Sequence, residues 1–538
     1  MENMSISVGI IDYFIIISYF VFVVVVGVIL RKLIKTDSDF FLSGRSLPAW
    51  ITGIAYLAAN LGALELLGMA ASGAQYGMLT MHYYWMGAIP AMVFVGLYMY
   101  PFFYASKARS IPEYLKFRYN EATRGLNAIT FFVLTILFSG ISLYAMGLIF
   151  SVLLGWSMLF SILVAAIVVL LYVSLGGLTS SIYNEVIQFF LIWIGLLPVA
   201  LIGMYKFGGI SGILANMPES FTHLWQGLGS TADNPMGVSW FGIIIGLSFI
   251  LSFGYWMTDF LVAQRAFAAK DVRAAQNTPI YASFFRLLVP IVVIIPGFIA
   301  IPLFPQLGLD PDMPYNLALP LTLVELLPEG LFGLGITALL AAFMSGMAGN
   351  ITAFTTVWTY DIYQAYLKKD GSDQHYIKVG RLMVVIGTVF AVFAAFLAAN
   401  FPNIMDYIQM LFSFFNAPFF ATFFLGVFWK RATGWGAFWG LLLGITSSFL
   451  MYFFIPSEFY STMAEGNFSR ALYAWIVTMV ITIIVSLFTK PKPESELRGL
   501  VRSVSEKISY KELPWYKRPG YLAVISLVLM VIINIYFW

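Results

Sequence analysis

Long apolar stretches recur along most of the 538 residues, with short polar connections between them. A membrane-spanning helix needs about 20 mostly apolar residues, and the pattern predicts a chain of about fourteen such helices, all-α and polytopic. The predicted spans lie at residues 9–30, 48–76, 79–104, 126–154, 157–176, 181–205, 238–264, 277–303, 328–365, 379–399, 404–429, 433–455, 471–489 and 519–537.

The segment at 48–76 differs from a plain membrane helix. Glycines recur through it, and it contains Asn60 and Glu65. A carboxylate at membrane depth costs roughly 2.5–3.5 kcal/mol, so Glu65 should face protein or water. Such a segment fits a broken helix that lines a binding site. A helix whose small residues pack closely against its neighbours explains the glycines equally well.

A second interrupted segment lies five spans later, at 238–264. Because the offset of five is an odd number of spans, the two segments have opposite orientations. Paired irregular helices in two inverted halves mark a substrate site in many transporters. The halves would then comprise spans two to six and spans seven to eleven.

Charge supports this assignment of spans. Only 10% of residues are charged, against about 25% in soluble proteins. With both termini outside, nearly all basic loop residues fall inside, among them Arg124 and Arg265. Only Lys206 and Arg470 fall outside, and Arg286 lies within a span.

Composition also excludes several chemistries. The chain has no cysteine, which excludes disulfides, cysteine zinc sites and iron–sulfur clusters. The sequence offers neither a nucleophile–base pair nor a metal cluster of the kind an enzyme needs, so the protein is predicted not to be an enzyme. Bulky aromatics beside the proposed site favour an occluding carrier over an open channel, and a sensor would usually carry an appended signalling domain.

Four polar positions inside or beside spans are candidates for function. Arg286 offers planar donors for hydroxyl or carboxylate groups, or it forms a structural ion pair with Glu65 or Asp259. Asp259 follows the aromatic pair Tyr255–Trp256. Ser345 begins a cluster of hydroxyl and amide side chains that extends to residue 356. Glu185 lies at the inner mouth of the sixth span, either as a solvated group or as a cation relay.

Several runs in the chain resemble the sodium/solute symporter family, in particular its sodium/glucose and sodium/galactose cotransporters. The resemblance covers about residues 35–450, in the family's order. The runs are FFLSGRSLPAWITGIAYLAANLGALELLGMAASGAQYG, RSIPEYLKFRYN, YVSLGGLTSSIYNEVIQ, YWMTDFLVAQRAFAAKD and DYIQMLFSFFNAPFFATFFLGVFWKRATGWGAFWG.

The resemblance implies the five-plus-five inverted-repeat fold of the leucine-transporter type. It places an extra helix and first inside loop at 1–47, the first repeat at 48–205 and an outside connector at 206–237. The second repeat follows at 238–432 and the C-terminal helices at 433–538. It implies a multi-pass protein of the plasma or bacterial inner membrane, with an unknown oligomeric state.

Sodium is the coupling ion that the resemblance implies. The family's sodium ligands fall on the carbonyls of Ala58, Leu61 and Ala342 and on the hydroxyl of Ser345. The family's second hydroxyl position is Gly346, which has none. Glu185 matches an acid on the family's inward sodium exit route.

The resemblance also implies a solute site. Positions that match family sugar contacts are Asn60, Tyr255, Trp256 and Gln409, with Arg286 in place of a lysine, Glu65 in place of glutamine or histidine and Tyr84 in place of glutamate. Tyr83 and Tyr255 match gate positions. The expected activity is sodium-coupled import of a sugar or similar hydroxylated solute by alternating access. The changed polar set leaves open a polyol, carboxylate or amino acid substrate, and weakened or absent sodium coupling.

Overall fold

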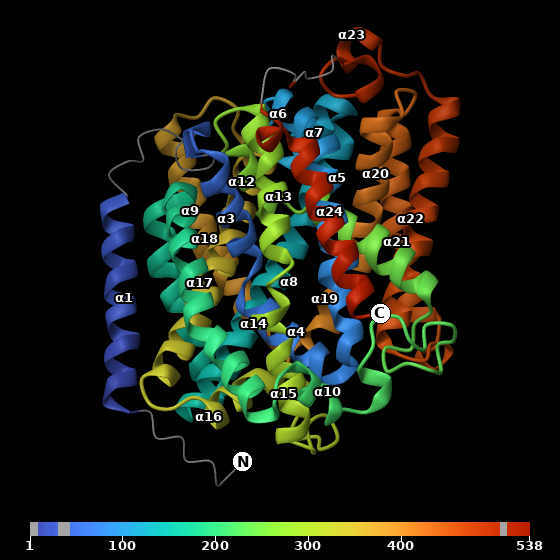
Figure 1. The fold of residues 1–538 in the computed structure, drawn as a ribbon. Coiled ribbons are helices and arrows are strands. Elements are labelled where there is room, and N and C mark those ends of the chain that lie inside the picture. Colours follow the sequence, from blue (N-terminus) through green and yellow to red (C-terminus); the bar gives the residue numbers. More distant parts are fainter. Residues whose placement is uncertain (1–8, 31–42, 506–509, 511–513) are drawn as a thin grey trace.

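The computed structural model of the protein describes residues 9–30, 43–505, 510 and 514–538. Figure 1 shows a bundle of helices that run mostly between two opposite ends of the molecule. The described residues form no β-strand. The predicted first inside loop falls mostly on residues 31–42, outside the described residues.

The described helices follow the predicted apolar segments closely. Their bounds are α1 Ile10–Leu30, α3 Ala49–Asn60, α4 Ala63–Tyr76, α5 Ile89–Phe94, α6 Tyr100–Ala105, α7 Ile111–Arg118, α8 Glu121–Leu154, α9 Met158–Phe207, α10 Ile210–Ala215, α11 Phe253–Thr258, α12 Phe260–Phe267, α13 Val272–Arg286, α14 Pro290–Val293, α15 Ile295–Leu303, α16 Ala318–Leu326, α17 Leu331–Val357, α18 Asp373–Ala398, α19 Ile404–Phe414, α20 Asn416–Phe428, α21 Gly434–Phe454, α22 Met463–Phe488, α23 Glu494–Leu497 and α24 Pro519–Tyr536. π-helical segments, which have wider turns than an α-helix, connect some of them: η4 Tyr84–Ala88, η7 Gly242–Ser252 and η9 Trp358–Leu367.

The count of fourteen spans is not confirmed. The described residues contain eight helices long and apolar enough to cross a membrane, or up to eleven if each bent pair is one span. The spans expected at 157–176 and 181–205 belong to one helical element, α9, because helical backbone continues through the Gly176–Gly177 pair, where the sequence suggests a loop.

The predicted interruption at 48–76 is a break between α3 and α4. The Leu61 N–H still bonds the Leu57 carbonyl at 3.0 Å, but the Gly62 N–H bonds the Asn60 carbonyl at 2.7 Å instead of continuing the α-helical pattern. The Ala58 carbonyl thereby loses its usual helical partner four residues on. Leu61 is buried at this link.

The second interrupted segment breaks at Asp259. Here η7 and α11 meet α12 at a 51° bend. Asp259 has extended backbone, and its carboxylate accepts a hydrogen bond from the Leu261 N–H at 2.8 Å. Aspartate is a favoured residue for capping a helix N-terminus, which explains why α12 restarts at this point.

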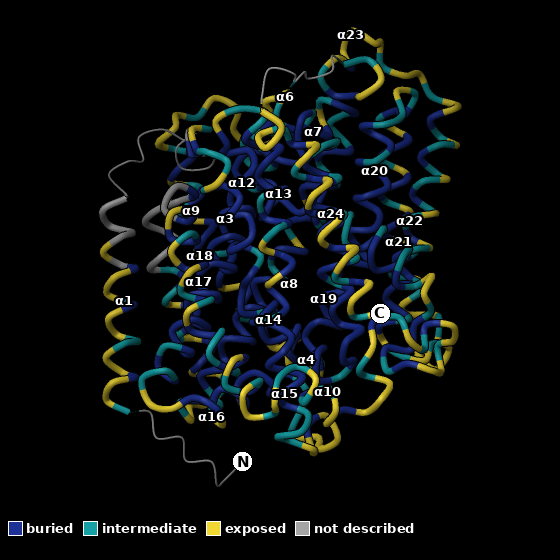
Figure 2. The backbone as a smooth tube through the Cα atoms, in the orientation of Figure 1, coloured by how far each residue is buried: buried dark blue, intermediate teal, exposed yellow. Residues whose placement is uncertain are grey.

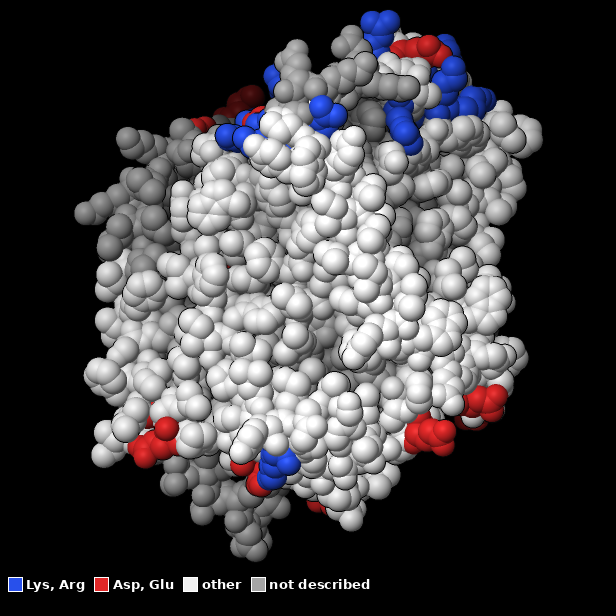
Figure 3. Space-filling view, in the orientation of Figure 1, with Lys and Arg blue, Asp and Glu red and all other residues white. Residues whose placement is uncertain are grey.

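Burial separates an inner group of helices from an outer one. Figure 2 shows α3, α4, α8 and α17 largely buried, whereas α1 and α24 carry exposed stretches. The exposed side chains on those outer helices are large and apolar, such as Phe14 and Val531. Extensive exposed apolar surface is what a bilayer-embedded protein needs. In Figure 3 the broad middle band is uncharged where the structure describes it, and Lys and Arg gather at the upper end.

Candidate functional site

A cavity lies between the two helix breaks. The predicted site residues that line it are Asn60, Glu65, Tyr83, Tyr84, Tyr255, Trp256, Arg286, Gly346 and Gln409. The predicted residues that do not line it are Ala58, Leu61, Glu185, Ala342 and Ser345.

The two broken helices touch each other beside this cavity. The Asn60 amide donates a hydrogen bond to the Tyr255 hydroxyl at 2.8 Å. One turn earlier on α3, Tyr56 stacks on Trp256 with ring centroids 5.3 Å apart. The last turn of α3 and the short α11 are therefore held together by one polar and one aromatic contact.

Arg286 projects from the end of α13 and forms an ion pair with Glu65. Its Nη1 lies 2.8 Å from Glu65 Oε1, and its Nη2 donates to the Asn60 side chain. The Tyr84 hydroxyl donates to the same carboxylate oxygen at 2.6 Å. The guanidinium carbon also lies 4.5 Å from the Tyr84 ring centroid and 5.1 Å from that of Trp256. Of the two partners left open by the sequence, Glu65 is the one that pairs with Arg286.

Besides Arg286, whose Nε has no hydrogen-bond partner, Gln409 and Tyr83 each keep a buried polar atom without a protein partner. Gln409 donates through Nε2 to the Met405 sulfur at 3.3 Å, but its Oε1 has no partner, and neither has the Tyr83 hydroxyl. Buried polar atoms are nearly always hydrogen-bonded in proteins. These two atoms are therefore available to a ligand.

On the face of α19 that lines the cavity, the sequence predicts only Gln409 as a site residue. Met405, Ile408 and Phe412 line the cavity beside it. Positions 405, 408, 409 and 412 follow the three- and four-residue spacing of one helix face. This periodicity is visible in the sequence and identifies the apolar neighbours once Gln409 is placed in the site.

The expected sodium ligands lie where α17 crosses the α3–α4 break. The Ser345 hydroxyl donates to the freed Ala58 carbonyl at 3.0 Å. Gly346 packs against Gly62 so closely that an added Cβ would lie 2.9 Å from the Gly62 Cα, and a Cβ on Gly62 would lie 3.7 Å from the Ala342 carbonyl oxygen. The missing hydroxyl at Gly346 thus coincides with a backbone-to-backbone contact that leaves no room for a side chain.

Glu185 is buried, which contradicts the interpretation of this residue as a solvated group. Its carboxylate pairs with the Arg265 guanidinium and accepts a hydrogen bond from Ser181 at 2.6 Å. The assignment of Arg265 to an inside loop is also wrong: it lies on α12 and is fully buried. A guanidinium is buried only when it is paired, and the pair joins α12 to α9.

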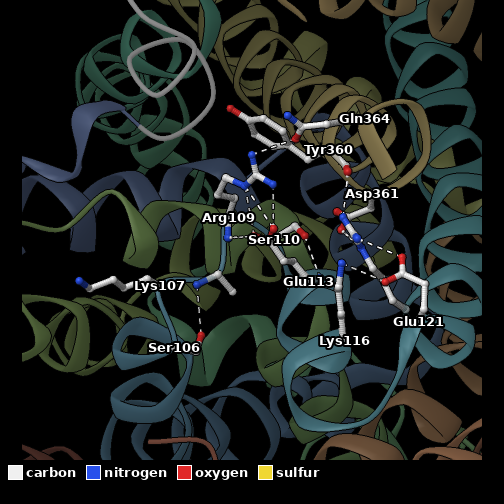
Figure 4. Close-up of polar contacts among 12 residues, drawn as sticks. Ser106, Lys107, Arg109, Ser110, Glu113, Lys116, Glu121, Tyr360, Asp361 and Gln364 are labelled. Carbon is white, nitrogen blue, oxygen red and sulfur yellow. Dashed lines mark hydrogen bonds and ion pairs between the residues drawn. The ribbon is translucent and has the colours of Figure 1, made fainter. Parts of the chain in front are cut away.

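A polar network lies where α7, the start of α8 and η9 meet (Figure 4). Ser110 caps α7 by accepting from the Glu113 N–H at 3.0 Å, and Glu113 in turn accepts from the Arg109 N–H at 2.6 Å. This reciprocal arrangement resembles a capping box. Burial raises the pKa of Glu113, but hydrogen bonds and charge from Arg109 outweigh burial and hold that pKa below its usual value.

The same network ties α8 to η9. Arg124 donates to Asp361 at 2.7 Å and to the Tyr360 carbonyl at 2.8 Å. Arg109 lies 4.1 Å from the Tyr360 ring centroid and donates to Gln364 at 3.0 Å. Arg124, which the sequence assigns to a loop, is therefore a buried residue of α8. Its partners Tyr360 and Asp361 lie more than two hundred residues away, so the sequence gives no signal for these two contacts.

The family profile of the sodium:solute symporter family matches residues 40–444. The chain belongs to the sodium:solute symporter family. It is a multi-pass membrane transporter, not an enzyme, and the coupling ion of its homologues is sodium. These findings confirm the resemblance seen in the sequence.

Individual relatives of this symporter family member cover most of its length. A sodium/glucose cotransporter of Vibrio parahaemolyticus is 30% identical over 513 residues, 91% of this chain and 92% of that protein. Sodium/glucose cotransporter 4 of Mus musculus is 28% identical over 93% of this chain and 78% of that protein.

A solved structure shows the fold. The outward-open, substrate-bound structure of a sodium-coupled sialic acid symporter aligns with a TM-score of 0.77 at 22% identity, covering 90% of this chain and 99% of that one. The family member thus has the predicted fold of the leucine-transporter type.

Proposed function

We propose that the protein is a sodium-coupled symporter that imports a sugar or a similar hydroxylated solute by alternating access. The observation that carries this proposal is the cavity between the two helix breaks, with the unpaired acceptor of Gln409 in it and the Ser345–Ala58 contact beside it. Broken helices that meet at one site are how such carriers bind a solute and an ion together. The names of the homologous cotransporters favour a sugar.

The site residues take the roles that the sequence suggests. The solute contacts Asn60, Glu65, Tyr84, Tyr255, Trp256, Arg286 and Gln409, and Tyr83 and Tyr255 close over it. Sodium binds the carbonyls of Ala58, Leu61 and Ala342 with the Ser345 hydroxyl. Gly346 offers no oxygen, so a water molecule completes the coordination. Glu185 lies on the route by which sodium leaves.

The protein works in the plasma or bacterial inner membrane with both termini outside. The concentration of Lys and Arg at one end of the molecule supports this orientation, because cytoplasmic loops carry an excess of basic residues (Figure 3). The inverted repeats comprise residues 48–205 and 238–432, each beginning with one of the broken helices.

Uptake into proteoliposomes tests the proposal. Full-length protein is reconstituted, and uptake of radiolabelled glucose, galactose and myo-inositol is measured with an inward sodium gradient. Uptake of at least one of them should exceed that in protein-free vesicles and should vanish when potassium replaces sodium. Equal uptake with potassium or with a proton gradient alone would contradict sodium coupling. Sodium-dependent uptake of only a carboxylate or an amino acid would contradict the sugar assignment.

A further inference from the structure

Arg286 is the one basic side chain among the described residues that line the cavity, and its guanidinium is already engaged. Glu65 binds Nη1 at 2.8 Å, Asn60 accepts from Nη2, and the rings of Tyr84 and Trp256 lie against the guanidinium plane. Only 5% of the Arg286 side chain and 8% of the Glu65 side chain are exposed. The Nε of Arg286 is buried without a hydrogen-bond partner, but a solute carboxylate that bound Nη1 would have to displace Glu65.

The cavity holds a second carboxyl group. Asp259 lines the same space, with one oxygen engaged by the Leu261 N–H. The cavity therefore contains two carboxyl groups, of Glu65 and Asp259, against the single guanidinium of Arg286. A solute that carries its own carboxylate would meet like charge and would leave Glu65 buried without its partner, which is strongly unfavourable in a low-dielectric site.

We propose that Glu65 makes this site reject anionic solutes by occupying, from within the protein, the position where a solute carboxylate would bind Arg286. This inference rests on the proposed function and narrows its substrate class to uncharged polyhydroxylated molecules. The unpaired groups agree with it, since the Gln409 Oε1 can accept from a neutral hydroxyl and the Tyr83 hydroxyl can exchange hydrogen bonds with one.

The test compares sugars with their uronic acids, which differ by oxidation of one CH₂OH group to a carboxylate. Glucose, galactose, glucuronate and galacturonate are titrated against the purified full-length protein in sodium buffer, and binding is followed by thermal stabilisation. The wild type should bind neither acid in the range where it binds a neutral sugar. Glu65→Gln keeps the side-chain shape but removes the charge, so Arg286 is released and affinity for at least one acid should rise tenfold or more.

Tyr84→Phe is the matched control. It removes the other hydrogen bond to the Glu65 oxygen, made at 2.6 Å, but leaves the ion pair in place, so it should gain no affinity for either acid. Size-exclusion chromatography checks that each variant is folded. If Glu65→Gln does not fold, the wild-type titrations alone test the inference. Wild-type protein that binds a uronic acid as tightly as the parent sugar overturns it.

The outcomes separate this inference from the proposed function. If no neutral sugar is taken up in response to a sodium gradient, the sugar assignment is refuted. The acid titrations still test the role of Glu65, because they measure binding and not uptake. A folded Glu65→Gln protein that binds both acids no better than the wild type overturns the role of Glu65, even if glucose is transported normally.

Discussion

Gln409 is the side chain at which the proposed solute contact can be tested most directly. Its Oε1 is buried in the cavity without a partner. An unmet buried hydrogen bond costs about 1–3 kcal/mol, which a solute hydroxyl can recover on binding. Gln409→Ala should therefore weaken solute binding about tenfold, the equivalent of about 1.4 kcal/mol.

The measurement is the concentration of solute that half-saturates uptake. Gln188→Ala is the control. Gln188 is also buried with an unpaired Oε1, but it does not line the cavity, and its Nε2 donates a hydrogen bond to the Tyr19 hydroxyl. Similar effects of the two substitutions on uptake would mean that Gln409 acts through folding and not through the solute.

Ser345 makes a separate prediction about the ion. Its hydroxyl bonds the Ala58 carbonyl that the helix break has freed. Ser345→Ala removes the hydroxyl that we propose as a sodium ligand, so the sodium concentration for half-maximal uptake should rise several-fold, whereas solute affinity at saturating sodium should stay near wild type. Ser142→Ala is the control, because this buried serine only bonds the Phe138 carbonyl of its own helix. An unchanged sodium dependence would place the ion elsewhere.

The sequence predicted the cavity residues better than it predicted the buried arginines. Asn60, Glu65 and Arg286 stand out because a polar group inside an apolar segment is costly and needs a reason. Arg265 stands near the end of such a segment, where a basic residue is ordinary. Only the fold, which brings Glu185 from α9 against it, shows that Arg265 is buried.

At the scale of elements, the contact between α17 and the α3–α4 break depends on two glycines. A Cβ on Gly346 would lie 2.9 Å from the Gly62 Cα, a backbone atom that cannot move aside without shifting a helix. Gly346→Ala should therefore destabilise the protein by about 1–3 kcal/mol, as overpacking usually does. Thermal unfolding in detergent measures the change.

Gly520→Ala provides the matched control. Gly520 also lies in a helix, α24, but an added Cβ there meets nothing within 4 Å. Alanine favours helix over glycine by about 1 kcal/mol, so this substitution should leave stability unchanged or raise it. A Gly346→Ala protein as stable as the Gly520→Ala protein would mean that the two helices are free to separate.

The existence of the broken helices could be predicted, but the geometry at their breaks could not. Glycines, Asn60 and Asp259 within apolar segments mark both interruptions in the sequence. The way the breaks meet depends on Tyr255 and Trp256 reaching residues about two hundred positions away. For the same reason, the sequence shows that Gly346 lacks a hydroxyl but not that Gly62 fills the space.

At the scale of the whole molecule, the network of Figure 4 joins three separate elements at one end. Glu113 contributes to it as a carboxylate, with its pKa held below the usual value by Arg109. A lowered pKa in the folded state adds stability above the unfolded-state pKa, near 4.3, and that stability is lost as pH falls through the folded-state pKa.

Thermal unfolding of the detergent-solubilised protein should therefore shift to lower temperature as pH falls from about 6 to below about 4.3. Glu113→Gln should make this shift smaller and should lower stability at neutral pH. Glu458→Gln, which changes an exposed carboxylate, should leave the shift intact. A pH profile of Glu113→Gln that superimposes on that of the wild type would mean that the ion pair between Arg109 and Glu113 contributes nothing to the free energy of unfolding.

The ion pair of Glu65 and Arg286 has a consequence for membrane voltage. A pair of opposite charges that moves as a unit across the electric field carries no net charge, so the pair itself adds no voltage dependence to the transport cycle. With an uncharged solute, each coupled sodium ion then brings one uncompensated charge inward. That charge gains about 2.3 kcal/mol from an inside-negative potential of 100 mV. The symporter should generate an inward current that follows solute addition and grows as the membrane is hyperpolarised.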